Sequence, residues 1–101
     1  MAYKIRETAL ALQDLDNILS YLVRTLENPI AAANFINAVE SFYDDVERMP
    51  RMFGLCHDPR LRALGYRKAV IKNYVCVYKV DETENTVYIL RFSMAGKTMK
   101  N

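Results

Sequence analysis

The stretch that decides the fold is Gly65–Asp81, which reads GYRKAVIKNYVCVYKVD. Its apolar residues are mostly β-branched or aromatic, and such residues suit a pleated, half-buried surface. The pair Lys72-Asn73 interrupts the apolar run, and asparagine tolerates the left-handed backbone that a two-residue hairpin turn requires. The stretch therefore predicts two strands joined by a tight turn, with Asn73 in the left-handed conformation.

A third strand is predicted over residues 86–92, after a polar turn at residues 81–85. The strand before that turn is apolar on both faces. One face carries Tyr74, Cys76, Tyr78 and Val80, and the other carries Val75 and Val77. Strands of this kind are typical of the middle of a sheet. We therefore expect this strand to have a neighbour on each side.

The first part of the chain predicts one strand followed by a helix. Residues 1–7 alternate between apolar and charged side chains, which predicts a short strand with one buried face. Thr8 is placed to cap the helix, because its hydroxyl can accept a hydrogen bond from an unpaired backbone N–H. Apolar residues then recur at steps of three and four, which predicts an amphipathic helix. The predicted stripe contains Leu12, Leu15, Leu19, Leu22 and Leu26, widened by Ile18 and Val23.

A second helix is predicted after Asn28-Pro29, because proline at the first helical position loses only an N–H that has no partner. Its predicted stripe contains Phe35, Val39, Phe42, Val46 and Met49, widened by Ile36 and Tyr43, and Pro50 ends it. Residues 51–64 have no clear period, which predicts a loop with one short helical turn at most. The resulting order β-α-α-β-β-β predicts an α+β fold. In it, a helical hairpin packs on one face of a mainly antiparallel four-stranded sheet and leaves the other face open to a ligand.

The composition fits one globular domain, residues 1–101. No apolar run approaches the roughly 20 residues of a membrane helix. The N-terminus also lacks the apolar segment of a secretory signal, so we expect a cytoplasmic protein without membrane contact. The cysteines, Cys56 and Cys76, favour free buried thiols over a disulfide or a zinc site. There is no Gly-rich phosphate loop or metal-ligand cluster, and His57 is the only histidine, so we expect no metal and no cofactor.

Charge is distributed unevenly along the chain. Residues 1–50 hold four basic and eight acidic side chains, whereas residues 51–101 hold ten basic and four acidic ones. This split indicates either a face directed at a polyanion or an acidic partner, or simply a solvated surface with uneven charge. The basic and aromatic residues of the predicted sheet could hold RNA, since arginine and lysine bind phosphates and tyrosine stacks on bases. Alternatively, the tyrosines are core residues with hydroxyls at the rim.

The sequence resembles the RelE/ParE family of bacterial toxins from Tyr3 to about Gly96. The residues that carry the resemblance are Tyr3-Lys4-Ile5, Asp14-Leu15, Ile18, Tyr21, Phe35, Gly65-Tyr66-Arg67-Lys68, Asn73-Tyr74, Tyr78-Lys79-Val80-Asp81-Glu82, Val87, Ile89 and Arg91. The resemblance implies a small toxin, of the kind that also stabilises plasmids. It further implies that a cognate antitoxin holds the toxin inactive in a hetero-oligomer.

The resemblance leaves the cellular target open between two branches. One branch looks like ribosome-dependent mRNA endoribonucleases and the other like inhibitors of DNA gyrase. The middle strand carries Val75 where the nucleases often have arginine, and the tail SMAGKTMKN has neither tyrosine nor histidine as an acid or base. Without such a group a nuclease loses about a hundredfold to ten-thousandfold in rate. The gyrase branch often has a basic run after the last strand, and here that run is reduced to isolated lysines, of which Lys97 is the first.

We therefore expect a ParE-like gyrase inhibitor, with a RelE-like nuclease and a non-toxic protein-interaction module as alternatives. Whether the chain is an enzyme stays open. If it is a nuclease, the candidate catalytic residues are Arg67, Lys68 and Arg91. The candidate residues for binding nucleic acid or a partner protein are Arg67, Lys68, Lys72, Arg91 and Lys97. Because Arg67 and Lys68 are neighbours in a strand, they must point to opposite faces of the sheet.

Overall fold

The structure is a computed structural model that describes residues 2–95. Its elements are β1 (Lys4–Glu7), α1 (Ala9–Ser20), the π-helical turn η1 (Tyr21–Thr25), α2 (Pro29–Arg48), α3 (Pro59–Ala63), β2 (Arg67–Ile71), β3 (Tyr74–Asp81) and β4 (Thr86–Met94). The predicted β-α-α-β-β-β order is confirmed. The turn η1 prolongs the first helix, and α3 is the short helical turn expected between residues 51 and 64. None of the described helices is long and apolar enough to cross a membrane.

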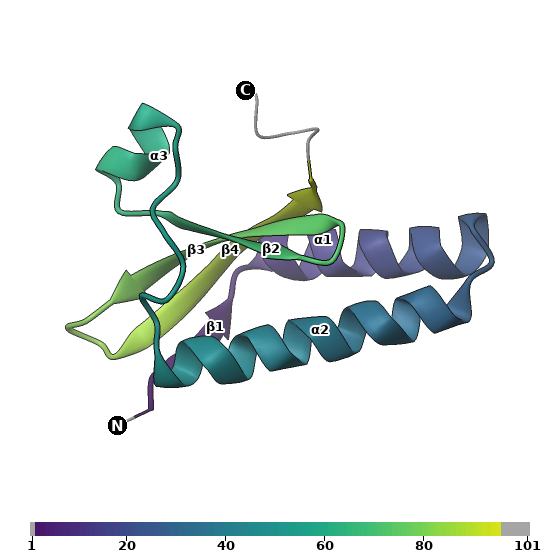
Figure 1. Cartoon of the computed structure of the whole chain (residues 1–101), viewed down its shortest axis with the longest axis horizontal. Coiled ribbons are helices and arrows are strands. Elements are labelled where there is room, and N and C mark those ends of the chain that lie inside the picture. The colour runs from purple at the N-terminus through teal and green to yellow at the C-terminus, as the bar shows by residue number, and fades with distance from the viewer. Residues whose placement is uncertain (1, 96–101) are drawn as a thin grey trace.

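The four strands form one mixed sheet in the order β1-β4-β3-β2. β1 pairs in parallel with β4, and the other two pairings are antiparallel. β3 is thus an inner strand, as its two apolar faces predicted. Helices α1 and α2 lie side by side against one face of the sheet, while α3 stands apart beyond the start of β2 (Figure 1). The fold class is therefore the predicted one.

The helix ends follow the signals in the sequence. The Thr8 hydroxyl accepts a hydrogen bond from the Ala11 N–H at 3.1 Å, and the Asn28 side chain accepts one from the Ala31 N–H at 3.0 Å. Pro29 takes the first position of α2, and that helix ends at Arg48, just before Pro50. Each cap satisfies a backbone N–H that a helix leaves unpaired at its start.

The core lies between the helices and the inner face of the sheet. Its aromatic centre contains Phe35 and Phe42 of α2 together with Tyr74 and Tyr78 of β3. The Tyr78 ring is fully buried, and its hydroxyl donates a hydrogen bond of 2.8 Å to the Pro50 carbonyl. This bond ties the end of α2 to the middle of the sheet. The two cysteines are free and buried, as expected.

The predicted helix stripes were too wide. Leu12, Val23 and Leu26 of the first stripe are about half exposed, and so are Ile36 and Met49 of the second. The fully buried position at the start of α1 is Ala11, whose small side chain allows the helix to approach β4 closely. Each helix has only one side against the sheet. The flanking apolar residues are therefore left in solvent.

Two details of the strands also differ from the predictions. In the hairpin turn, the left-handed residue is Lys72, with φ of 57°, and not Asn73. The last strand runs to Met94 and contains a bulge, because Val77 pairs with Arg91 while Tyr78 pairs with Ile89. The bulge places Ile89 and Phe92 on the same buried face although they are three residues apart, and it turns Arg91 outward.

Candidate functional site

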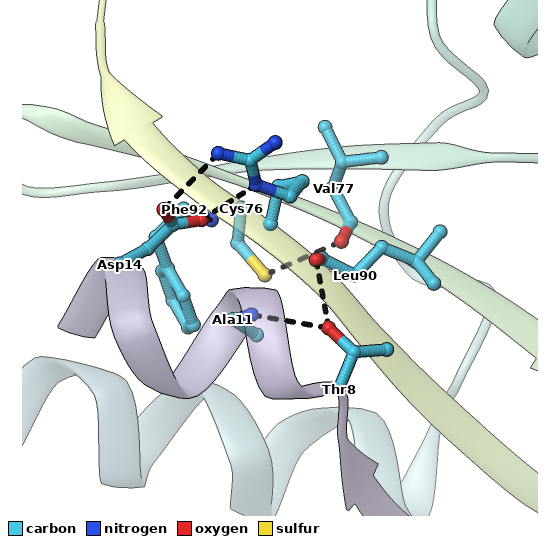
Figure 2. A network of polar contacts seen from close by, with 8 residues as sticks. Thr8, Ala11, Asp14, Cys76, Val77, Leu90 and Phe92 are labelled. Atoms are coloured by element: carbon cyan, nitrogen blue, oxygen red, sulfur yellow. Dashed lines mark hydrogen bonds and ion pairs between the residues drawn. The ribbon is translucent and has the colours of Figure 1, made fainter.

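Arg91, one of the predicted site residues, is held by a carboxylate of α1. Its guanidinium donates hydrogen bonds to both Asp14 oxygens, at 2.8 and 3.1 Å. The same carboxylate accepts the Phe92 N–H at 3.0 Å (Figure 2). Asp14 raises the pKa of Arg91 above its ordinary value through this hydrogen bond and through its charge. The positive charge of Arg91 is therefore largely balanced within the molecule.

This contact has a structural origin in the unequal lengths of β1 and β4. β1 ends opposite Ile89, so the rest of β4 has β3 on one side and no strand on the other. Side chains of α1 satisfy that edge instead, because the Thr8 hydroxyl donates to the Leu90 carbonyl at 3.0 Å and Asp14 binds the next outward N–H, that of Phe92. Figure 2 shows Thr8 just before α1 and Asp14 further along the helix, both beside β4. Arg91 is thus bound by a carboxylate that also holds the backbone of β4.

Arg67 is also engaged inside the molecule. It pairs with Tyr78 across the sheet, so it lies on the helix-facing side, and its guanidinium donates to the Phe53 carbonyl at 2.7 Å. Lys68 pairs with Val77 and lies on the opposite face. The expectation that Arg67 and Lys68 point to opposite faces is confirmed. Arg67 thus holds the loop before α3 against β2.

The outer face of the sheet brings together two of the predicted cations. Lys68, Val77 and Arg91 form one row across three strands. Adjacent strands lie about 4.8 Å apart, so the two cationic residues start roughly 10 Å from each other. Val75 and Val77 are buried at the centre of this face. The charge of Lys68 suits an anionic partner, whereas Val75 and Val77 expose little apolar surface.

The remaining predicted residues lie elsewhere. Lys72 is exposed in the β2–β3 turn, at the end of β2 that is farther from Lys68. Lys97 lies outside the described residues. The predicted cations therefore do not converge on a single pocket. Across residues 2–95 no group of histidine, cysteine and carboxylate side chains could hold a metal ion.

One protein family matches nearly the whole chain. The model of the family described as "ParE toxin of type II toxin-antitoxin system, parDE" matches residues 5–97. The chain belongs to the ParE toxin family. This result confirms the resemblance to the RelE/ParE toxins inferred from the sequence. A search of curated proteins found no match.

Solved structures agree with this assignment of the ParE-family chain. It resembles a protein of the RelBE2 toxin–antitoxin complex of Mycobacterium tuberculosis, with 26% identity, a TM-score of 0.66 and coverage of 93% of this chain and 99% of that one. A chain of the chromosomal ParDE system of P. aeruginosa matches with 18% identity, a TM-score of 0.70 and coverage of 92% and 96%. The free E. coli toxin RelE, in a mutant form, matches with 19% identity, a TM-score of 0.66 and coverage of 97% and 88%. The two matches of lower identity establish the shared fold alone.

The ParE-family chain has a second exposed surface that the sequence assigned to the core. Leu12, Leu19 and Val23 recur at steps of seven and four, so they share one side of α1 and η1. Ile36 and Tyr43 are seven residues apart on α2, and the Tyr43 hydroxyl donates to Glu7, just before α1, at 2.7 Å. Leu19 and Tyr43 are partly buried against the core, whereas Leu12, Val23 and Ile36 are 42 to 50% exposed, and these three residues are here called the helical patch. A stripe wider than one side of a helix was the signal for it in the sequence.

Proposed function

We propose that this ParE-family chain arrests growth by inhibiting DNA gyrase and that a cognate antitoxin neutralises it. The match of the ParE toxin family over residues 5–97 carries the proposal. The proposed place of action is the cytoplasm, where gyrase works. The activity calls for no metal and no cofactor from this chain.

The state of the arginines supports the gyrase branch over the nuclease branch. A ribonuclease needs free cations for the phosphate charge and an acid–base pair at the 2′-OH. Here Asp14 binds Arg91, and the Phe53 carbonyl binds Arg67. Val75 is buried at the centre of the outer face. Of the three catalytic candidates, Lys68 is the one whose side chain makes no hydrogen bond or ion pair with another residue of the described chain.

A RelE-like mRNA endoribonuclease is the second candidate. The row of Lys68, Val77 and Arg91 favours it, because a basic row across a sheet can follow a nucleic-acid backbone. Tyr88 is half-buried and pairs with Lys79, so it adds an aromatic ring to the same face. A plain interaction module without toxicity is the third candidate.

Two experiments separate the three candidates. Growth is measured after induction of the gene alone and together with the gene beside it. We expect arrest in the first case and recovery in the second, and normal growth at high soluble expression would favour the module. The purified protein is then tested in a gyrase supercoiling reaction and on ribosomes carrying mRNA. Loss of supercoiling without cleavage supports the proposal, whereas codon-phased cleavage would give Lys68 and Arg91 catalytic roles.

A cognate antitoxin is supported by the M. tuberculosis relative, which was solved as a toxin–antitoxin complex. Two surfaces of this chain suit such a partner: the helical patch offers exposed apolar side chains, and the outer face offers the cation of Lys68. Apolar burial supplies most of the affinity of such complexes, whereas opposite charges mainly speed association. We therefore expect acidic antitoxin residues over Lys68 and apolar ones on the helical patch.

The electrostatic part of this proposal is tested by association rates. The substitution Lys68→Glu reverses the charge without touching the contact between Arg67 and Phe53. We expect slower association with the antitoxin at low salt and a smaller difference as salt rises, since exposed charges are screened over about 10 Å at 0.1 M. Arg62→Glu on α3, outside the sheet, is the matched control. Equal rates for Lys68→Glu and the control at low salt would exclude the outer face as a docking surface.

A further inference from the structure

A cleft opens where the end of the helical hairpin faces the β2–β3 turn. Two adjoining hollows of about 580 and 170 Å³ make it up, and both are lined by Leu22, Ala31, Lys72, Asn73 and Tyr74. The combined space is in the range of pockets that take a large side chain or a small ligand. The cleft lies apart from the row of Lys68 and Arg91 on the outer face.

The floor of the cleft is apolar. Leu22 of η1 and Phe35 of α2 are buried beneath it, and Ala31 gives it depth because its side chain is small. Tyr21 and Leu26 stand at its rim, and each is 42 to 50% exposed. Such a floor favours an apolar occupant.

Two polar groups at the cleft are donors, beside the amides of Asn28, Asn34 and Asn73, which can donate and accept. The pKa of Tyr74 is raised by burial and by the neighbouring phenol of Tyr21, so the Tyr74 hydroxyl keeps its proton at neutral pH. The Lys72 ammonium makes no ion pair within the part of the chain that the structure describes. A carboxylate on the occupant would complement the charge of Lys72.

Two backbone irregularities meet at the same place. Lys72 has a left-handed backbone with φ of 57°, which costs an ordinary residue about 1–2 kcal/mol. On the opposite wall, α1 gives way to the π-helical turn η1, an arrangement that is frequent at functional sites. Strained residues also collect where a ligand binds. The two features place the Lys72 cation and the Tyr21 ring on facing walls of the cleft.

We propose that this cleft is an anchor site for the antitoxin, which inserts one large apolar side chain above Leu22 and Ala31 and pairs an adjacent carboxylate with Lys72. The proposal rests on the proposed function, because it assumes a cognate antitoxin. The cleft is continuous with the exposed apolar end of the helical hairpin at Leu26, so one partner segment can cover both. A second copy of this chain fits less well, since a two-fold contact at this rim would bring two Lys72 side chains together.

The test uses the full chain, the intact antitoxin encoded beside it and overlapping 15-residue peptides of that antitoxin. Ala31→Leu fills the floor, with Ala33→Leu on the exposed side of α2 as its matched control. Lys72→Glu reverses the rim charge, with Arg62→Glu on α3 as its control. Circular dichroism and thermal unfolding verify that each variant is folded. Lys72→Gly provides a further variant that removes the ammonium and suits the left-handed backbone.

We expect the dissociation constant to rise about tenfold or more for Ala31→Leu and for Lys72→Glu, and to change less than about twofold for the controls. One peptide with an apolar residue next to Asp or Glu should bind the wild type and lose affinity for both cleft variants. Tight antitoxin binding that is equal in the wild type and all five variants would overturn the anchor site and leave the proposed function intact. Self-association that only the cleft variants abolish would assign the cleft to a second copy and overturn it as well. If the wild type does not bind the antitoxin at all, the proposed function fails and the anchor site with it.

Discussion

Removal of the Asp14 carboxylate should destabilise the protein mainly through the backbone of β4. In Asp14→Ala, the Phe92 N–H loses its acceptor at 3.0 Å on an otherwise buried residue. An unsatisfied buried N–H costs about 1–3 kcal/mol. The ion pair with Arg91 adds less, because the Arg91 side chain is 54% exposed and exposed pairs contribute about 0–1 kcal/mol. The expected loss is therefore about 2–3 kcal/mol, or roughly 10–20 °C in Tm for a domain of this size.

The assay is urea and thermal unfolding of Asp14→Ala, Arg91→Ala and the double variant. We expect Arg91→Ala alone to cost less than about 1 kcal/mol and the double variant to resemble Asp14→Ala, since the dominant bond does not involve Arg91. Asp14→Asn should be intermediate, because its amide oxygen can still accept the Phe92 N–H. A loss below about 0.5 kcal/mol in Asp14→Ala, or an equal loss in both single variants, would refute the assignment of this carboxylate to the edge of β4.

Three further predictions concern stability. Thr8→Ala should lower the free energy of unfolding by about 1–2 kcal/mol in urea titrations, because the helix cap and the bond to Leu90 are both lost. Thr8→Ser should retain most of the wild-type stability, because its hydroxyl can make both bonds. Backbone hydrogen bonds hold the pKa of Asp58 below its ordinary value, so its contribution to stability is present above about pH 4 and is lost as pH falls through the lowered folded pKa. Asp58→Asn should reduce the loss of unfolding free energy at acid pH in urea titrations. An unchanged loss would contradict the role of Asp58 as the cap of α3. Burial raises the pKa of Tyr78 to about 12, so stability should fall as pH rises from about 10 toward that value. Tyr78→Phe should remove the phenolate absorbance that appears near pH 12 and lessen the loss of stability at alkaline pH, and an unchanged absorbance titration would contradict this.

The sequence could predict those parts of the fold that depend on local signals. The caps Thr8 and Asn28, the two-residue turn and the inner position of β3 all follow from neighbouring residues. The bulge in β4 could not be predicted, because it is decided by which residues β3 places opposite Val77 and Tyr78. The width of the buried stripe on α1 likewise depends on how the helix meets the sheet.

The sequence predicted less of the candidate site than of the fold. The family resemblance indicated which basic positions to consider, but not which of them are free. Arg91 is bound by a residue 77 positions away, and Arg67 by a backbone carbonyl that no side-chain pattern reveals. The left-handed Lys72 was missed because the turn could be formed with either residue in that conformation. Contacts between distant segments therefore decide the electrostatics of the surface.

The parallel pairing of β1 with β4 has a consequence for how the protein is made. β1 is the first strand to be synthesised, yet its partner in the sheet, and the carbonyl that Thr8 binds 82 residues away, come last. No intermediate length of nascent chain can complete the sheet, because β4 is an inner strand between β1 and β3. A premature stop codon at positions 82–85 would leave β1 without a partner and β3 as an edge strand, and a stop at positions 8–81 would also shorten or remove β3. Mutants selected for loss of toxicity should therefore include stop codons throughout this part of the chain.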